Sequence, residues 1–168
     1  KRYRIYLVGH AHIDMNWLWP WKETEDLIRR DFESVDAIME QYPDVCFSHS
    51  QAVTYKAMQE QYPELWARIK ARIDQGRWDV TASTWVEGDL NMAGYETMIR
   101  QLLEGISYCR EQLGVSPEIC WEPDTFGHPA TMPDILSRAG LKYYYLCRPG
   151  QGVPLFWWEG EHGSRVLA

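Results

Sequence analysis

Residues 5–14 of the chain read Ile5-Tyr6-Leu7-Val8-Gly9-His10-Ala11-His12-Ile13-Asp14. The first four residues form an apolar run, which predicts a short buried strand that ends at Gly9. Histidine and aspartate side chains follow at once. A buried strand followed by such residues is typical of α/β proteins, which place their functional sites just beyond the carboxyl ends of strands.

Helical and strand patterns alternate along the rest of the chain. Apolar residues at helical spacing predict helices over 24–42, 51–75 and 95–113, of which Pro63 divides the second. Short apolar runs predict further strands over 45–48, 78–81, 118–121 and 141–147. We therefore expect one α/β domain with a mainly parallel sheet and helices packed outside it.

Helix ends are marked by specific residues. Gly76 and Gly114 each follow a predicted helix, where glycine commonly ends the last turn. The stripe expected to be buried in the third long helix comprises Tyr95, Ile99, Leu102, Ile106, Cys109 and Leu113. Thr131 and Asp134 have the spacing of a capping box, which predicts a short helix ending at Gly140.

Composition excludes several classes of partner. The formal net charge is −7 and no long basic tract occurs, so we expect neither nucleic acid nor a membrane as partner. No apolar run approaches the roughly 20 residues that span a bilayer. The four cysteines are scattered without a CxxC pair, which predicts reduced, buried thiols and a cytoplasmic location. Nine Trp and ten Tyr suit either a core or a surface for sugar rings.

The segment after the first strand offers metal ligands. If the chain stays extended, His10, His12 and Asp14 face one side, because side chains alternate along a strand. Imidazole and carboxylate groups at that spacing can bind a divalent metal, with zinc the expected ion and cobalt the alternative. A hydrogen-bonded polar strand end is the other interpretation of this segment.

Two further segments follow predicted strands. Residues 121–129, WEPDTFGHP, combine two acids, a histidine and two prolines, and prolines hold a loop in one conformation. Residues 85–91, WVEGDLN, offer two more acids. Each segment taken alone also fits a rigid turn or a solvated loop.

Together, the order HxHxDxNWLW, TWVEGDLN and WEPDTFGHPATMPDIL resembles the class II α-mannosidases, family thirty-eight of the glycoside hydrolases, and most closely their cytosolic branch. The resemblance runs from Tyr6 to Leu167. It implies that the chain is the N-terminal portion (1–168) of a catalytic domain, with an incomplete β/α barrel, because such barrels take roughly 250 residues.

The resemblance also implies roles for individual residues. His12 and Asp14 match two metal ligands, and Asp124 matches the catalytic nucleophile, whose carboxylate also contacts the metal. Residues expected to bind the sugar are Trp17, Phe126 and Asp89. We expect His10 and His128 to hold in place the residues that contact the metal and the sugar, without contacting either themselves. Asn16 stands where relatives often have a small residue.

The expected activity is hydrolysis of terminal α-D-mannosides with retention. Retention needs two carboxyl groups about 5–5.5 Å apart, one as nucleophile and one as acid/base. The family's acid/base residue and a fourth metal ligand, a histidine, are expected beyond residue 168, and His162 is not a convincing substitute. We therefore expect the isolated chain to be inactive and a mannose-containing glycan to be the substrate of the longer protein. Assembly into a homo-oligomer stays an open alternative.

Two rival hypotheses stay open at this stage. Metal-dependent amidohydrolases also place HxH after a first barrel strand and would use His10 and His12 together to bind metal and activate water. A folded but non-catalytic sugar- or metal-binding fragment is the second rival.

Overall fold

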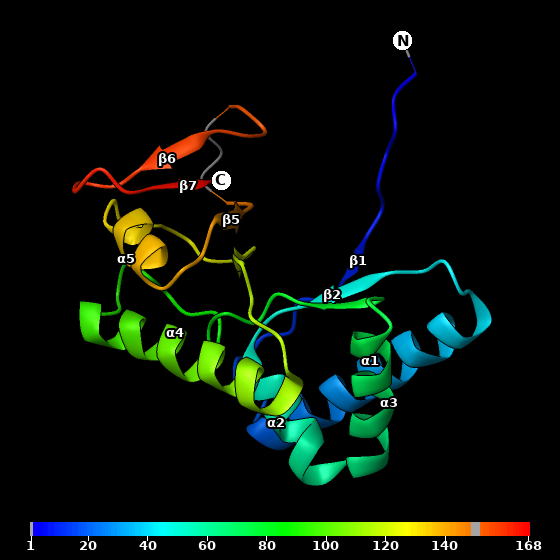
Figure 1. Ribbon diagram of the computed structural model, residues 1–168. Helices are drawn as coiled ribbons and strands as arrows, with labels where there is room; N and C mark the ends of the chain where they lie inside the picture. The colour runs from blue at the N-terminus through cyan, green and yellow to red at the C-terminus, as the bar shows by residue number, and fades with distance from the viewer. Residues whose placement is uncertain (1, 149–151) are drawn as a thin grey trace. The chain divides into compact units, whose positions relative to one another are not determined.

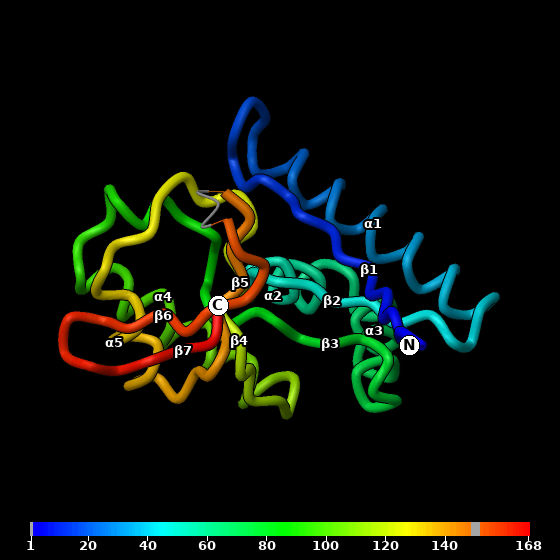
Figure 2. The backbone as a smooth tube through the Cα atoms, turned by 90° about the horizontal axis from the view of Figure 1, so that it is seen from above, coloured from blue at the N-terminus to red at the C-terminus, as the bar shows by residue number. Residues whose placement is uncertain are grey.

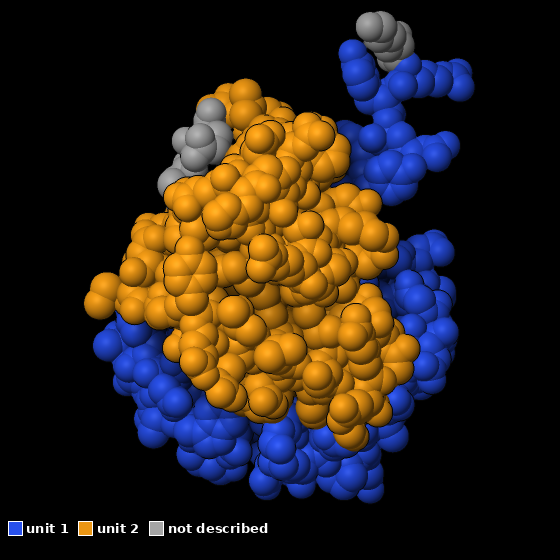
Figure 3. Space-filling model, turned by 60° about the vertical axis from the view of Figure 1, so that its left-hand side comes forward, with its two compact units in different colours: residues 1–49, 54–80 blue, residues 50–53, 81–168 orange. Residues whose placement is uncertain are grey.

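The computed structural model describes residues 2–148 and 152–168, which form two compact units. Of the described residues, unit 1 comprises 2–49 and 54–80, and unit 2 comprises 50–53, 81–148 and 152–168 (Figure 3). The short segment 50–53 belongs to unit 2 because the N–H groups of Ala52 and Val53 donate to the carbonyls of Thr84 and Trp85. Within the described residues, every helix is too short or too polar to cross a lipid bilayer.

Unit 1 is a parallel sheet with helices. Its strands β1 (Gly9–His10), β2 (Phe47–His49) and β3 (Trp78–Val80) pair in that order. Its helices are α1 (Trp21–Gln41), α3 (Pro63–Asp74) and most of α2 (Ala52–Gln61). These bounds confirm the helices predicted from apolar spacing and the division at Pro63, which is the first residue of α3.

The core of unit 1 is aromatic. The ring of Phe32 in α1 lies 5.7 Å from that of Tyr55 and 5.0 Å from that of Trp78, and Phe47 lies 4.7 Å from Trp78. The Trp78 indole N–H donates to the Tyr55 hydroxyl over 2.9 Å, and that hydroxyl donates to the carbonyl of His49. The polar ends of these large side chains are therefore satisfied inside the core.

One buried residue of α1 is charged. Asp36 of α1 accepts hydrogen bonds of 2.8 Å from both Arg68 and Arg72 of α3, the helix that packs against α1. Tyr42, the last apolar residue of the helix predicted over 24–42, is 53% exposed. The two arginines compensate the Asp36 charge and so allow it on a buried face.

The predicted strand over residues 5–8 is wrong. Ile5, Tyr6, Leu7 and Val8 are 59–87% exposed, and pairing begins only where the Gly9 N–H donates to the Cys46 carbonyl. Figure 1 shows this part of the chain as an extended segment that leads into β1. An apolar run forms a strand only when a partner accepts its hydrogen bonds, and within the described residues no strand pairs with 5–8.

Unit 2 has a second sheet with the order β4-β5-β7-β6. Strands β4 (Ile119–Glu122), β5 (Tyr143–Leu146) and β7 (Arg165–Leu167) are parallel, whereas β6 (Trp157–Glu159) runs antiparallel to β7. The fold is thus α/β with parallel sheets, as expected, but the strands of the described residues fall into two sheets and close no barrel.

The helices of unit 2 are α4 (Tyr95–Tyr108), the π-helical turn η1 (Cys109–Leu113) and α5 (Met132–Arg138). Leu102 and Ile106 of α4 pack in one core with Cys120, Tyr144 and Val166 from the sheet. Figure 2 shows α5 beside the β6–β7 hairpin, in agreement with the contacts between these elements. Gly114 ends η1 with a φ of 74°, a conformation that favours glycine.

Two local predictions in unit 2 are wrong. Tyr95 and Ile99 were expected in the buried stripe of α4 but are 55% and 44% exposed, because Met98 and Gly105 face the core instead. Thr131 makes no side-chain capping bond. The Asp134 carboxylate accepts the backbone N–H groups of His162 and Ser164, so the β6–β7 turn takes the partner that the capping box would have used.

The cysteines match the expectation in part. All four are free, but only Cys109 and Cys120 are buried, whereas Cys46 and Cys147 are exposed.

Candidate active site

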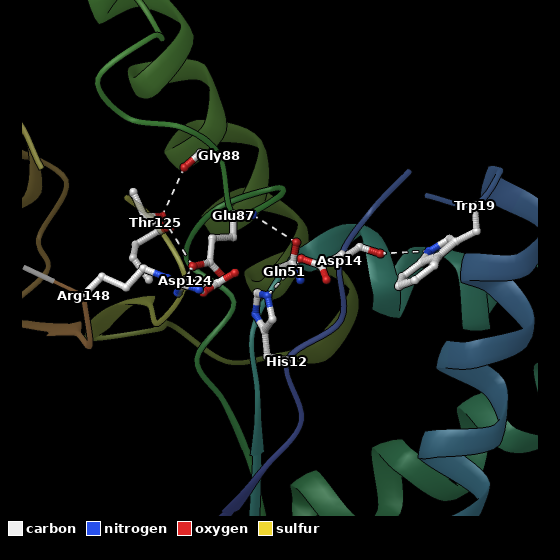
Figure 4. Close-up of polar contacts among 10 residues, drawn as sticks. His12, Asp14, Trp19, Gln51, Glu87, Gly88, Asp124, Thr125 and Arg148 are labelled. Carbon is white, nitrogen blue, oxygen red and sulfur yellow. Dashed lines mark hydrogen bonds and ion pairs between the residues drawn. The ribbon is translucent and has the colours of Figure 1, made fainter. Parts of the chain in front are cut away.

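The segment after β1 pairs two of the predicted ligands. The ring Nε2 of His12 lies 3.3 Å from Oδ1 of Asp14, and the Trp19 indole N–H donates to the Asp14 carbonyl over 3.3 Å (Figure 4). His10 is held separately, with its Nδ1 2.9 Å from the Ser48 hydroxyl. His12 and Asp14 therefore form a His/Asp pair that can ligate a metal, while His10 contacts the neighbouring strand.

The chain turns sharply after this pair. Asn16 has a φ of 50°, a conformation that non-glycine residues seldom adopt and that asparagine tolerates best. Trp17 follows with 64% of its surface exposed, and its ring meets that of Trp19 edge to face at 5.6 Å. The turn thus leaves a large aromatic face open to solvent close to the His12–Asp14 pair in sequence.

In unit 2, Asp124 stands two residues beyond β4. Its backbone N–H donates to Oε1 of Glu87 over 2.5 Å, and its Oδ1 accepts from the guanidinium of Arg148, which follows β5 (Figure 4). The Arg148 guanidinium also lies 4.4 Å from the centroid of the Phe126 ring. Parallel pairing of β4 with β5 brings Asp124 and Arg148 together, since the carboxyl ends of parallel strands meet at one edge.

Glu122 is the last residue of β4 and is fully buried. It accepts hydrogen bonds from Thr125, Thr84 and the Cys120 thiol. Burial, and then the nearby Glu87 carboxylate, raise the pKa of Glu122 to about 8. The buried carboxyl is therefore mostly protonated at neutral pH and is a poor nucleophile there.

The segment over residues 85–91 makes two kinds of contact, one within itself and one to the loop that carries Asp124. The side chain of Asp89 accepts the Asn91 N–H over 3.2 Å and is exposed. The Asn91 side chain packs so closely on Gly127 that a Cβ there would lie 1.8 Å from Asn91 Nδ2. The segment therefore contacts the loop that carries Asp124, and the substrate-binding role expected for Asp89 stays a prediction.

His128 is half-buried and contacts Tyr144 of β5. Its Nδ1 is 2.6 Å from the Tyr144 hydroxyl, and its ring meets Tyr144 and Trp158 edge to face. Burial lowers the pKa of His128. The hydrogen bond and ring contacts of His128 can stabilise the loop that carries Asp124.

The chain is similar in sequence to a known family of proteins and to individual members of it. Residues 2–168 match the family described as "Glycosyl hydrolases family 38 N-terminal domain". This chain belongs to that family. Alpha-mannosidase 2C1 of Mus musculus is 36% identical over 173 residues, which cover 99% of this chain and 17% of that protein. Alpha-mannosidase G of Dictyostelium discoideum is 35% identical over 98% of this chain and 16% of its own length.

The fold of the family 38 chain is also found in solved structures. An alpha-mannosidase from Enterococcus faecalis V583 superposes with a TM-score of 0.84 at 21% identity, covering 95% of this chain and 19% of that one. At this identity the likeness concerns the fold. The chain spans about a sixth of the length of the curated relatives it matches.

Membership of family 38 decides between the two enzyme families, whereas the alternative of a non-catalytic sugar- or metal-binding fragment stays untested. The resemblance to class II α-mannosidases is confirmed, and the amidohydrolase alternative loses its basis, since it placed the chain in another family. Sequence reasoning did not single out Arg148. The signal that could have found it is its place directly after the predicted strand over 141–147, where parallel strands present site residues.

Proposed function

We propose that this chain forms the nucleophile-bearing part of a metal-dependent retaining α-mannosidase that hydrolyses terminal α-D-mannosides in mannose-containing glycans. The match of residues 2–168 to family 38, together with relatives named alpha-mannosidase, supports the activity. The observation that carries the mechanism is the Asp124 carboxylate, which stands beyond β4 with its backbone held by Glu87 and its Oδ1 bound by Arg148.

Asp124 is the proposed nucleophile. One of its carboxylate oxygens attacks the anomeric carbon and forms a glycosyl ester as the bond to the leaving oxygen breaks. The leaving oxygen must gain a proton, and water must later hydrolyse the ester, so a second carboxyl group is needed as acid and then base. Glu122 does not fit the nucleophile's role, because its buried carboxyl favours the protonated form at neutral pH.

We further propose that His12, Asp14 and Asp124 hold a divalent cation, zinc before cobalt. The donor set fits, since each of the three side chains offers one ligand atom and neutral imidazole with carboxylate is a set that zinc prefers. Such a cation supplies a template for sugar hydroxyls and charge stabilisation at the site. The proposed contacts to the mannose ring are Trp17, Phe126 and Asp89. The proposed role of His10 and His128 is to hold the residues that contact the metal and the sugar in place.

A cytoplasmic location completes the proposal. It is supported by the four cysteines, all of them described and none in a disulfide.

Covalent trapping tests the proposal. A fluorinated mannosyl fluoride should label the full natural chain that carries this sequence, and peptide mass analysis should place the label on Asp124. Asp124→Ala should abolish both labelling and turnover of an activated aryl α-mannoside. A label on Glu122 or Asp89 would overturn the nucleophile assignment while retaining the mechanism.

Turnover by the isolated 168-residue chain tests whether the acid/base carboxyl group lies within these residues. It should show little or no turnover, because general acid assistance is typically worth about 10²–10⁴ in rate. Robust hydrolysis by the isolated chain would place the acid within it, with Glu87, Asp89 and Glu122 as the first residues to replace.

A further inference from the structure

We infer that Glu87 is a positioning residue for the nucleophile: its carboxylate holds the backbone of Asp124 so that the Asp124 carboxylate stands in one place for attack. The inference rests on the proposed function and deepens it. All residues that carry it lie in unit 2, so the contacts are internal to one compact body (Figure 4).

The segment that carries Glu87 is firmly anchored. The backbone N–H of Glu87 donates to the side-chain carbonyl of Gln51 over 3.0 Å. The backbone N–H of Val86 donates to the side-chain carbonyl of Gln101, on α4, over 2.8 Å. Gln51 is 2% exposed and has a φ of 67°, an unfavourable conformation for glutamine. Gln51 is thus a buried residue with an unfavourable backbone conformation, and such strain persists only where the surrounding structure enforces it.

The carboxylate of Glu87 turns from this segment to the nucleophile's loop. Its Oε1 accepts the Asp124 N–H over 2.5 Å and lies 3.3 Å from the Thr125 hydroxyl. Thr125 is 3% exposed, and its hydroxyl oxygen lies 3.1 Å from the Gly88 carbonyl oxygen. The loop is therefore bonded to the Glu87 segment at Asp124 and lies close against it at Thr125.

These contacts bear on rate because they act on the residue that must attack. A nucleophile has to be held within about 0.5 Å of its productive position, and displacement by 1 Å can cost about 100-fold in rate. A charged acceptor holds an N–H about twice as strongly as a neutral one. Glu87 thus stabilises the Asp124 backbone more firmly than a neutral amide at this position would.

Two variants of the full natural chain test this role, with Glu96→Gln on the exposed face of α4 as the matched control. Glu87→Gln keeps the shape and an acceptor oxygen but removes the charge, and it should slow covalent labelling of Asp124 by the fluorinated mannosyl fluoride about tenfold. Glu87→Ala removes the acceptor and should slow labelling about 100-fold. The labelling rates are compared at saturating reagent. Because Glu87 is proposed to act on Asp124 alone, the half-saturating reagent concentration and the metal bound per chain should match those of the wild type.

A leaving-group series separates positioning from proton donation. If Glu87 positions Asp124, turnover should fall by the same factor for aryl mannosides with good and with poor leaving groups. A loss confined to poor leaving groups would make Glu87 the acid and overturn the inference. Labelling of Glu87→Gln at the wild-type rate would also overturn it, as would a loss of metal or of reagent binding that accounts for the slower labelling. Failure of the wild-type protein to form any covalent label would instead refute the proposed function, and a label on Glu122 or Asp89 would overturn the assignment of Asp124 as nucleophile.

Discussion

The ring nitrogen Nε2 of His12 lies 3.3 Å from Oδ1 of Asp14, and both side chains belong to the segment that directly follows β1. The two residues are separated by Ile13, which is 6% exposed. Burial of the intervening apolar side chain fixes the pair on the opposite side of the chain, because side chains alternate along an extended segment. The pair is therefore formed by the local backbone.

This pair predicts the effect of removing one ligand. His12→Ala should lower the affinity for zinc by at least about 100-fold, since loss of even a partner behind a ligand typically costs 10–100-fold. The measurement is metal content by mass spectrometry after dialysis against a weak chelator. His162→Ala, at an exposed histidine of the β6–β7 turn, is the control and should retain the metal. Full metal retention by His12→Ala would contradict the proposed ligand set.

Trp17 predicts a binding effect. Its exposed ring offers a flat apolar face to a sugar, and such contacts contribute about 1 kcal/mol, so Trp17→Ala should raise KM for an aryl α-mannoside about five- to tenfold. Trp157 of β6 is equally exposed, at 65%, and Trp157→Ala is the matched control. Equal KM values for Trp17→Ala and Trp157→Ala would remove Trp17 from the sugar site.

At Gly105, replacement by alanine is expected to destabilise the protein, although the same replacement usually stabilises a helix. Alanine normally stabilises a helix by about 1 kcal/mol relative to glycine. At Gly105 of α4, however, a Cβ would lie 2.5 Å from the carbonyl oxygen of Ser83 and 2.6 Å from the carbonyl carbon of Thr84. We expect Gly105→Ala to lower the free energy of unfolding by about 1–3 kcal/mol, measured by urea denaturation.

The control for this prediction lies on the same helix. Ser107 is exposed, so Ser107→Ala should change stability by no more than about 0.5 kcal/mol. Stabilisation by Gly105→Ala would show that α4 has room to move away from residues 83 and 84.

His49 predicts a loss of stability in acid. The side chain is fully buried between Phe32, Phe47 and Tyr55, and its burial, followed by repulsion from His10 and His12, lowers its pKa from 6.5 to about 3. Above pH 6.5 the ring is neutral in both states. Between pH 6.5 and about 3 the unfolded chain binds a proton that the folded chain does not, so stability falls as the pH is lowered.

His49→Phe should remove this dependence. The difference in unfolding free energy between pH 7 and pH 4.5 should shrink by about 2–3 kcal/mol relative to the wild type. His162→Phe, on an exposed turn, should leave the difference unchanged. A pH profile unaltered by His49→Phe would mean that other groups cause the acid sensitivity.

Local patterns in the sequence predicted most elements of both units. Apolar residues such as Ile28, Phe32 and Met39 recur at helical spacing, and the helix they predicted over 24–42 is observed as α1 (Trp21–Gln41). Pro63 divided two helices as expected, since proline lacks the N–H that a continuous helix needs. These predictions succeeded because they depend on interactions within one turn or across one break.

Elements that depend on a partner were predicted less well. The apolar run 5–8 has the composition of a strand but remains exposed, since a strand also requires hydrogen-bonding neighbours. Asp36 is buried although it is charged, because Arg68 and Arg72 reach it from another helix. Neither outcome can be read from a window of the sequence.

The same division holds for the candidate site. The sequence alone determined that His12 and Asp14 share one short segment and that an acid, Asp124, follows a strand, because spacing along a strand fixes which side chains share a face. Only the tertiary structure decided that Glu87 holds the Asp124 backbone and that Arg148 binds its carboxylate. Those contacts join residues 37 and 24 positions apart, and they exist because the segment anchored by Gln51 and Gln101 and the parallel pairing of β4 with β5 bring distant parts of the chain to one edge.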